Sequence, residues 1–251
     1  MAGHSHWASI KHKKGATDVK KGKIFSKIAR MITVAARRGG GDPDMNPKLL
    51  FAVSKARAVN MPKENVERAI QKGIGGGEGT ELFECVYEGY GPHGTALIAE
   101  IVTDNKNRTA PEIRKIFDRF GGNMGESGCV SWMFEKKGLI IVNSNDLNED
   151  EFMMVVLDAG AEDLLKVDDA FQVICAQTTL DAVKKAIEGK NIKVETAEVS
   201  WIPKSNIDLD EAAGRKVLGL MEALEDHDDV QNVYSNFNLP KTLLAEAQAE
   251  K

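Results

Sequence analysis

Residues 3–38 read GHSHWASIKHKKGATDVKKGKIFSKIARMITVAARR, and this stretch determines how the chain is organised. From Met1 to Gly75 there are 16 Lys and Arg against 5 Asp and Glu, a net charge of +11. The whole 251-residue chain carries 33 against 38, so residues 76–251 hold 17 against 33, a net charge of −16. This asymmetry indicates a polyanion-binding segment attached to an acidic body.

The same stretch predicts an amphipathic helix from Thr17 to the glycines at 39–41, which end it. Its apolar side chains recur at intervals of three and four residues and share one face: Ile24, Ile28, Met31 and Ala35. Residues 1–16 hold few apolar side chains, so we expect them to form a flexible arm.

Two further helices are predicted before a glycine-rich linker at 73–80. Asn46 is a favourable N-cap for a helix over 47–60 that begins with a proline. A third helix covers 62–73. The predicted inward side chains of the second helix are Leu50, Val53 and Ala56. The sequence therefore predicts a three-helix domain with its arm and linker at residues 1–80.

The rest of the chain alternates strand and helix patterns, which predicts an α+β fold. A capping box formed by Thr109 and Glu112 begins a predicted helix over 109–120. The predicted strands around it cover 84–90, 96–103 and 128–134.

A second group of elements follows in the ferredoxin-like order βαββαβ. Its predicted strands cover 138–143, 163–167, 171–176 and 193–202, and its helices cover 149–159 and 179–189. A helix at 209–225 and a strand at 230–236 remain, and they complete the first sheet if the βαββαβ unit is an insertion. We therefore expect a discontinuous α+β domain at 81–136 and 203–251, with an inserted domain at 137–202.

Nucleotide cofactors and metals are not expected. GYGPHG at 89–94 matches the dinucleotide-binding pattern, but a strand-like segment follows it where that pattern requires a helix, so it predicts a hairpin turn. His4, His6 and His12 are alternatives as metal ligands, but their basic surroundings hold no Cys and no carboxylate before Asp18. A solvated arm is the favoured interpretation.

No catalytic constellation is evident, so we do not expect an enzyme. The carboxylates at 222–229 lack a partner base, and His227 among them is predicted to lie at a solvated helix end. Trp132 and Trp201 are predicted as core residues of strands. Three cysteines without zinc or redox spacing are predicted as buried or idle thiols in strands: Cys85, Cys129 and Cys175.

The longest apolar runs, such as 152–157 and 31–36, are far shorter than the roughly 18–20 residues that a membrane span needs. No apolar signal-peptide core follows the basic N-terminus. We therefore expect a cytoplasmic protein with no membrane partner. No zipper or dimer surface is apparent, so a monomer is expected.

Cations on one helix face, joined to a basic arm with one aromatic residue, are typical of phosphate-backbone binding. Trp7 is a candidate for stacking on an exposed base. The predicted nucleic-acid-binding residues are Trp7, Lys11, His12, Lys13, Lys14, Lys20, Lys21, Lys23, Lys27, Arg30, Arg37 and Arg38. The alternative is a solvated helix with a flexible tail, but a charge of +11 exceeds what solubility requires.

The chain closely resembles the YebC family from its first residues, MAGHSHWASIKHKKGATDVKKGKIFSKIARMITVAARRGGGDPDMNPKL. The likeness continues through NMPKENVERAIQKG, YEGYGPHG, TDNKNRTAPEIRKIF, GGNMGESGCVSWMFEKKG and LEDHDDVQNVYSNF. The resemblance implies a helical N-terminal domain and two α+β domains, one of them inserted. Members are described as probable transcriptional regulators, and a mitochondrial relative as a translational activator of cytochrome oxidase. The family has no established catalytic residues to carry over.

Two positions differ from the common family pattern. His6 stands where members commonly carry Lys, which slightly lowers the charge of the arm. Cys129 and Trp132 lie in a predicted strand that usually holds smaller or hydroxyl residues, which predicts a repacked core.

The resemblance leaves two functions open: a regulator that binds promoter DNA, and a ribosome-associated translation factor that contacts ribosomal RNA. The residues weakly favour RNA, because a glycine-rich basic arm suits an irregular RNA surface and no clear recognition helix is present. The turns at 89–94 and 121–128 are either functional tips or ordinary turns.

Overall fold

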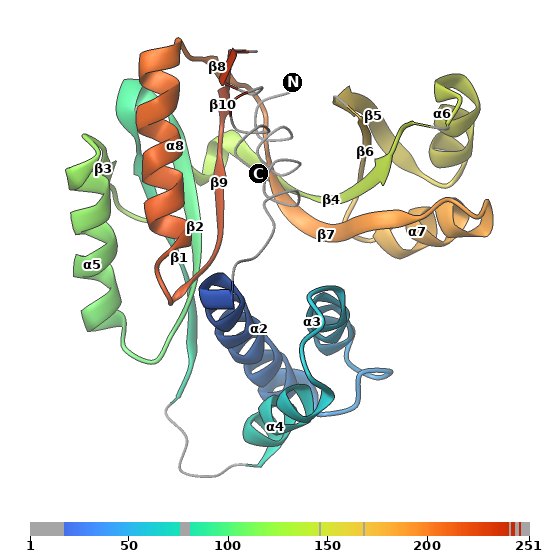
Figure 1. Ribbon diagram of the computed structural model, residues 1–251, viewed down its shortest axis with the longest axis horizontal. Helices are drawn as coiled ribbons and strands as arrows, with labels where there is room; N and C mark the ends of the chain where they lie inside the picture. The colour runs from blue at the N-terminus through green and yellow to red at the C-terminus, as the bar shows by residue number, and fades with distance from the viewer. Residues whose placement is uncertain are drawn as a thin grey trace. The chain divides into compact units, whose positions relative to one another are not determined.

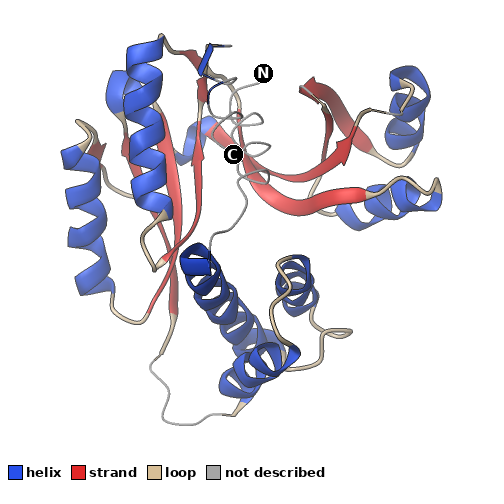
Figure 2. Ribbon diagram, in the orientation of Figure 1, coloured by secondary structure: helices blue, strands red, loops and turns tan. Residues whose placement is uncertain are grey.

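Most of the predicted helices and strands are present in the computed structural model, which describes residues 18–75, 81–145, 147–167, 169–240, 242–243 and 246 (Figure 1). Helices lead the chain and two four-stranded sheets follow (Figure 2). The fold divides into two units, one spanning 15–127 and 216–233, the other including 128–215 and 234–251.

Three helices, α2 (Asp18–Gly39), α3 (Pro47–Ala58) and α4 (Lys63–Ile74), form what we call the helical region. Their apolar faces share one core, in which Ile32 and Leu49 are fully buried. Because the core holds residues from all three helices, the burial of their apolar faces stabilises the region as one body. The predicted N-terminal three-helix arrangement is confirmed.

Asn46 joins α2 to α3 through both ends of its side-chain amide. Its Oδ1 accepts a hydrogen bond from the backbone N–H of Leu49 at 3.2 Å, as predicted for an N-cap. Its Nδ2 donates to the carbonyl oxygens of Ala35 (2.8 Å) and Gly40 (2.9 Å). The prediction that Leu50 faces inward is wrong: Leu50 is 49% exposed, and the neighbouring Leu49 fills the core instead.

The first sheet has the order β3-β1-β2-β9 and contains β1 (Phe83–Tyr90), β2 (Ala96–Thr103), β3 (Asn123–Met124) and β9 (Val230–Ser235). β1 and β2 are antiparallel, and the turn η1 (Pro92–Gly94) joins them. Helix α5 (Lys106–Arg119) packs on β1 and β3 and buries Ile113 and Phe117. Helix α8 (Glu211–Glu225) precedes β9 in sequence.

Two predicted boundaries in this part of the chain are wrong. Helix α5 begins after Asn105, whose Oδ1 accepts from the backbone N–H of Arg108 at 3.1 Å, so Thr109 lies inside the helix and forms no capping box. The predicted strand at 128–134 is instead a turn followed by a 3₁₀ segment, η2 (Ser131–Met133). Gly128 adopts φ 89°, which interrupts an extended strand.

The second sheet has the order β5-β6-β4-β7 and is antiparallel throughout. Its elements are β4 (Phe134–Asn143), α6 (Glu149–Asp158), β5 (Ala161–Val167), β6 (Ala170–Cys175), α7 (Leu180–Gly189) and β7 (Val194–Pro203). Along β4, Ile140 and Val142 belong to the core shared with α6 and α7, whereas Leu139 and Ile141 belong to a cluster on the opposite face. The predicted βαββαβ order is confirmed.

A short parallel pair, β8 (Ile207–Asp208) with β10 (Phe237–Asn238), completes the described strands. The α+β fold with an N-terminal helical part is therefore as predicted. The assignment of the chain to three domains at 1–80, 81–136 with 203–251, and 137–202 stays a prediction.

Candidate nucleic-acid interface

Half of the predicted binding residues can be placed on α2. Trp7, Lys11, His12, Lys13 and Lys14 lie outside the described residues, as does the side chain of Lys20. The six that can be placed are Lys21, Lys23, Lys27, Arg30, Arg37 and Arg38. Their role in binding stays a prediction.

Three of the six cations contact the C-terminal end of α8 and the turn after it. Lys23 Nζ donates to the carbonyl oxygen of Asp226 at 3.3 Å, and Lys27 Nζ donates to that of Glu225. Arg30 Nη1 donates to the carbonyl oxygen of Asp228 at 2.9 Å. Carbonyl groups at a helix C-terminus lack partners within the helix and carry partial negative charge, so they attract these cations. This face of α2 is therefore engaged within the protein.

The centre of this contact is the carboxylate of Asp229, whose side chain is only 3% exposed. It lies 2.6 Å from Arg30 Nη1 and 2.8 Å from Arg108 Nη2. The hydroxyls of Thr109 and Thr103 approach it at 2.7 Å and 3.0 Å. Burial alone would raise the pKa of Asp229, but the bonds from Thr109, Arg108 and Thr103 and the charge of Arg30 lower it to about 2.

The prediction of a solvated acidic end at 225–229 is therefore wrong for two of its residues. Asp229 is buried, and His227 has a side chain that is 15% exposed. His227 Nε2 lies 3.0 Å from Glu112 Oε2, and its Nδ1 accepts the backbone N–H of Asp229 at 3.1 Å. Thr109, which the sequence predicts as a helix cap, binds the carboxylate of Asp229 instead.

The two cations near the C-terminal end of α2 differ in their contacts. Arg38 pairs with Glu84 of β1, whereas Arg37 is exposed. Lys21, near the other end, is exposed as well.

Two cations that the sequence analysis did not select, Arg68 and Lys72, lie on the exposed side of α4. They are four residues apart, so they share one helix face. Neither makes a side-chain ion pair or hydrogen bond with any residue in the described ranges. Their spacing opposite the buried Val66 and Ala69 is the signal that could have identified them.

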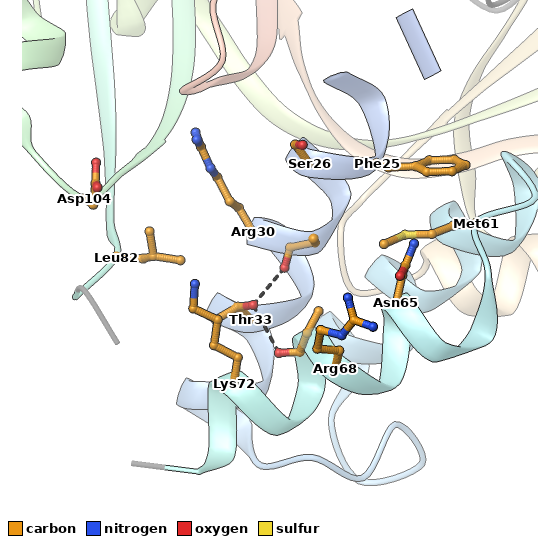
Figure 3. A pocket seen from close by; sticks show the side chains of 12 residues that line it. Phe25, Ser26, Arg30, Thr33, Met61, Asn65, Arg68, Lys72, Leu82 and Asp104 are labelled. Carbon is orange, nitrogen blue, oxygen red and sulfur yellow. Dashed lines mark hydrogen bonds between the residues drawn. The ribbon is translucent and has the colours of Figure 1, made fainter. Parts of the chain in front are cut away.

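Arg68 and Lys72 border an open pocket of about 410 Å³ between α2 and α4 (Figure 3). Of the three cations that line it, Arg30 is paired with Asp229, whereas Arg68 and Lys72 have no ion-pair partner among the described residues. The one carboxylate in its lining, Asp104, is contacted by Arg108 at 2.9 Å. Its lining residues are Phe25, Ser26, Ala29, Arg30, Thr33, Met61, Asn65, Arg68, Ala69, Lys72, Leu82 and Asp104. The local charge therefore favours an anion.

The floor of this pocket is a tight contact between α2 and α4. The buried Thr33 Oγ1 lies 2.9 Å from the carbonyl oxygen of Ala29 and 3.1 Å from that of Ala69 (Figure 3). A Cβ at Gly73 would lie 2.6 Å from the carbonyl oxygen of Thr33 and 2.7 Å from Cβ of Ala36, so only glycine fits there. The two helices therefore hold the backbone positions from which these cations extend at a fixed spacing.

The turns at 89–94 and 121–128 meet at the β1–β3 pair. Tyr90 is the register partner of Asn123, and the backbone N–H of Gly125 donates to the carbonyl oxygen of Glu88 at 2.9 Å. A strand, β2, follows GYGPHG, so the predicted hairpin turn is confirmed. His93 within it has φ 58°.

Trp132 and Cys129 do not lie in a strand, contrary to the prediction. Trp132 is 64% exposed on η2, and its Nε1 donates to the carbonyl oxygen of Cys129 at 3.1 Å. Trp201 does lie in β7, where Lys136 Nζ is 4.5 Å from its ring centroid. The repacked core expected at the first two residues is therefore absent from this segment.

The described part of the chain contains no group of three or more His, Cys, Asp and Glu that could hold a metal ion. None of its helices is both long and apolar enough to span a membrane. The three cysteines, all in described segments, are free thiols.

Known proteins match this chain over nearly its whole length. Probable transcriptional regulatory proteins of Halothermothrix orenii and Desulfotalea psychrophila are 51% and 52% identical to it, over 100% and 97% of this chain and 100% and 98% of theirs. The crystal structure of the conserved hypothetical protein Aq1575 from Aquifex aeolicus has a TM-score of 0.85 and 44% identity. The match covers 94% of this chain and 97% of that one.

Family comparisons give the same result. The family model of the TACO1/YebC protein N-terminal domain matches residues 5–76, and the family model of the TACO1/YebC second and third domain matches residues 82–237. The resemblance seen in the sequence is confirmed. The chain belongs to the TACO1/YebC family.

Proposed function

We propose that this protein is a non-enzymatic regulator of gene expression that binds nucleic acid through its phosphate backbone. The observation that carries the proposal is the open pocket of the helical region, where Arg68 and Lys72 have no ion-pair partner in the described ranges. Lys and Arg side chains supply most of the affinity for nucleic acid by neutralising phosphates and releasing counterions. The name of the relatives, probable transcriptional regulatory protein, supports the same role.

The predicted arm and the predicted cations of α2 belong to this proposal. The arm residues, Lys20, Lys21 and Arg37 contact phosphates, with Trp7 stacking on an exposed base. Lys23, Lys27 and Arg30 must first exchange their contacts with residues 225–229, so they contribute less.

Promoter DNA is the target that the relatives' name favours, and ribosomal RNA is the second candidate. The observation that favours RNA is the concave arrangement of the cations around a pocket. Reading duplex DNA needs a helix or ribbon that enters the major groove, whereas RNA recognition uses unstacked nucleotides of loops and bulges. Under this alternative the protein is a ribosome-associated translation factor. Both roles place it in the cytoplasm.

The test is the salt dependence of binding, measured by fluorescence anisotropy with duplex DNA and with a structured RNA. Replacing Lys11, Lys13, Lys14, Lys20 and Lys21 by glutamine is expected to reduce the slope of log K against log salt. The reduction is roughly 0.7–0.9 for each phosphate that the variant no longer neutralises. An unchanged slope with both ligands would show that the arm is not part of the nucleic-acid interface.

Sedimentation of a lysate then separates the two targets. Co-migration of the wild type with ribosomal particles, abolished in the five-glutamine variant, supports the ribosomal role. A wild type that stays at the top of the gradient but shifts promoter DNA supports the transcriptional role.

A further inference from the structure

We propose that the pocket between α2 and α4 binds one nucleotide, with its phosphate on the side of Lys72 and Arg30 and its base on the side of Phe25, Met61 and Arg68. This inference rests on the proposed function, because it assigns the ligand class of the same interface. The nucleotide is either free or an unpaired unit of an RNA strand, and the two sources share the chemistry that the pocket recognises.

The size and lining of the pocket fit a small ligand. Its volume of about 410 Å³ falls within the roughly 300–1,000 Å³ of small-molecule sites. Such sites combine apolar walls with a few convergent polar groups. The pocket has both, and Figure 3 shows Phe25, Met61, Asn65 and Arg68 on one side of Thr33 and Arg30, Lys72 and Leu82 on the other.

The cationic end suits a phosphate. Lys72 presents a point charge on this side, and Arg68, on the other side of Thr33, presents a planar guanidinium that can stack on a base or bind a neighbouring phosphate. Neither has to give up an ion pair with a described residue before binding. Arg30 uses Nη1 for its bonds to residues 228 and 229, so its other N–H groups remain available on the same side.

The opposite end suits a base. Phe25 is half-buried, so one part of the ring packs on the helical core and the rest lines the pocket. An aromatic ring gives a stacking surface that accepts any base. Asn65 offers an amide with both donors and an acceptor for base edges, and Ser26 adds a hydroxyl.

The pocket is built before the ligand arrives. Thr33 links α2 to α4 beneath it, and the close approach of Gly73 to Thr33 fixes the spacing of the two helices. A site held at fixed geometry loses less entropy on binding than one that must be ordered. The arrangement therefore favours a specific ligand over loose counterion attraction.

The experiment measures binding of the four ribonucleoside 5′-monophosphates, ribose 5-phosphate and inorganic phosphate to the full chain by chemical-shift titration. The double variant Arg68→Gln with Lys72→Gln is compared with Lys48→Gln and Arg57→Gln. The control pair removes the same charge from exposed positions on α3 outside the pocket. We expect nucleotide affinity to fall at least about tenfold in the pocket variant and to change less than about twofold in the control.

The variant Phe25→Leu keeps an apolar side chain in the helical core but removes the ring. It is expected to weaken nucleotide binding about tenfold while leaving the affinity for ribose 5-phosphate unchanged. An equal fall in affinity in the pocket and control variants would overturn the site, because general charge would then explain binding. Equal binding of inorganic phosphate and nucleotides would overturn it too.

Parallel titrations with single-stranded RNA and with duplex DNA separate this inference from the proposed function. Both polymers could bind while the affinities for mononucleotides and single-stranded RNA do not depend on Arg68 and Lys72. In that case the pocket assignment fails and the proposed function stands. If neither polymer binds and no mononucleotide binding depends on Arg68 and Lys72, both fail; if neither polymer binds but mononucleotides do in an Arg68- and Lys72-dependent way, only the proposed function fails. Competition of free nucleotides with single-stranded RNA supports an RNA unit as ligand, and binding of free nucleotides without competition supports a separate effector.

Discussion

Helices α2 and α4 both carry a row of cations, but the two rows are engaged differently. On α2, Lys23 and Lys27 donate to carbonyl oxygens at the end of α8, and Arg30 pairs with the buried Asp229. On α4, Arg68 and Lys72 face an open pocket without such partners in the described chain. The amino-acid count gives each of these five side chains the same unit charge, but only the pairing determines which of them is available to a ligand.

The difference follows from what lies opposite each helix. A helix C-terminus and a buried carboxylate attract the α2 cations, so their charge stabilises the fold. The α4 cations lie above an apolar contact with α2, where Ala69 and Gly73 allow close packing, and Asp104 is the one carboxylate among the described residues that line the pocket. Arg68 and Lys72 therefore stay available to an anionic ligand.

Removing the Asp229 carboxylate is expected to have the largest effect on the difference between the two rows of cations. Asp229→Ala leaves Arg30 and Arg108 without their shared carboxylate and two buried hydroxyls without an acceptor, so we expect a decrease of about 3–5 kcal/mol in the free energy of unfolding. Urea denaturation measures it. The matched control is Asp228→Ala: that side chain is exposed and it is the backbone carbonyl that contacts Arg30, so the change should be within about 0.5 kcal/mol. Equal effects of the two substitutions would contradict the network.

The contrast between the two rows could be predicted only in part from the sequence. Helical spacing predicted the helices and the buried face of α2, and the N-cap at Asn46 was correct, because these depend on neighbours a few residues away. Asp229 was missed because its four donors come from positions 30, 103, 108 and 109, far from it in the chain. Trp132 was assigned to a strand because apolar alternation cannot show that Gly128 turns the backbone.

Acid should weaken the α2 contact and leave the α4 pocket intact. The folded-state pKa of Asp229 is about 2, below its ordinary value of 3.8. A carboxyl group with a depressed pKa contributes stability that is complete above its unfolded pKa and disappears as pH falls through the folded value. Between about pH 5 and pH 2 we expect the stability of the wild type to fall by about 2 kcal/mol more than that of Asp229→Asn. Identical pH profiles of unfolding would show that the carboxylate is not preferentially stabilised in the folded state.

Gly73→Ala tests whether close packing of α2 on α4 supports the pocket. The added Cβ would meet backbone of α2 that cannot move freely, so we expect a decrease of about 1–2 kcal/mol in stability after the gain in helix propensity. Gly22→Ala is the control, because a Cβ added there would meet no described atom within 4 Å and the residue lies inside α2, so it should raise the melting temperature slightly. A Gly73→Ala protein as stable as the wild type would mean that the helices can separate without cost.

The smallest expected effect is a change in the salt dependence of nucleic-acid binding, and it compares the two rows of cations directly. Lys23→Gln with Lys27→Gln removes two charges that already have partners, and Arg68→Gln with Lys72→Gln removes two that have none in the described ranges. The α4 pair should reduce the slope of log K against log salt by roughly 1.4–1.8, and the α2 pair by less than half of that, because side chains already engaged within the protein neutralise few phosphates. Anisotropy titrations of one RNA at several salt concentrations measure both slopes. Equal reductions would show that nucleic acid displaces residues 225–229 from α2, and the two rows would then form one continuous phosphate-binding surface.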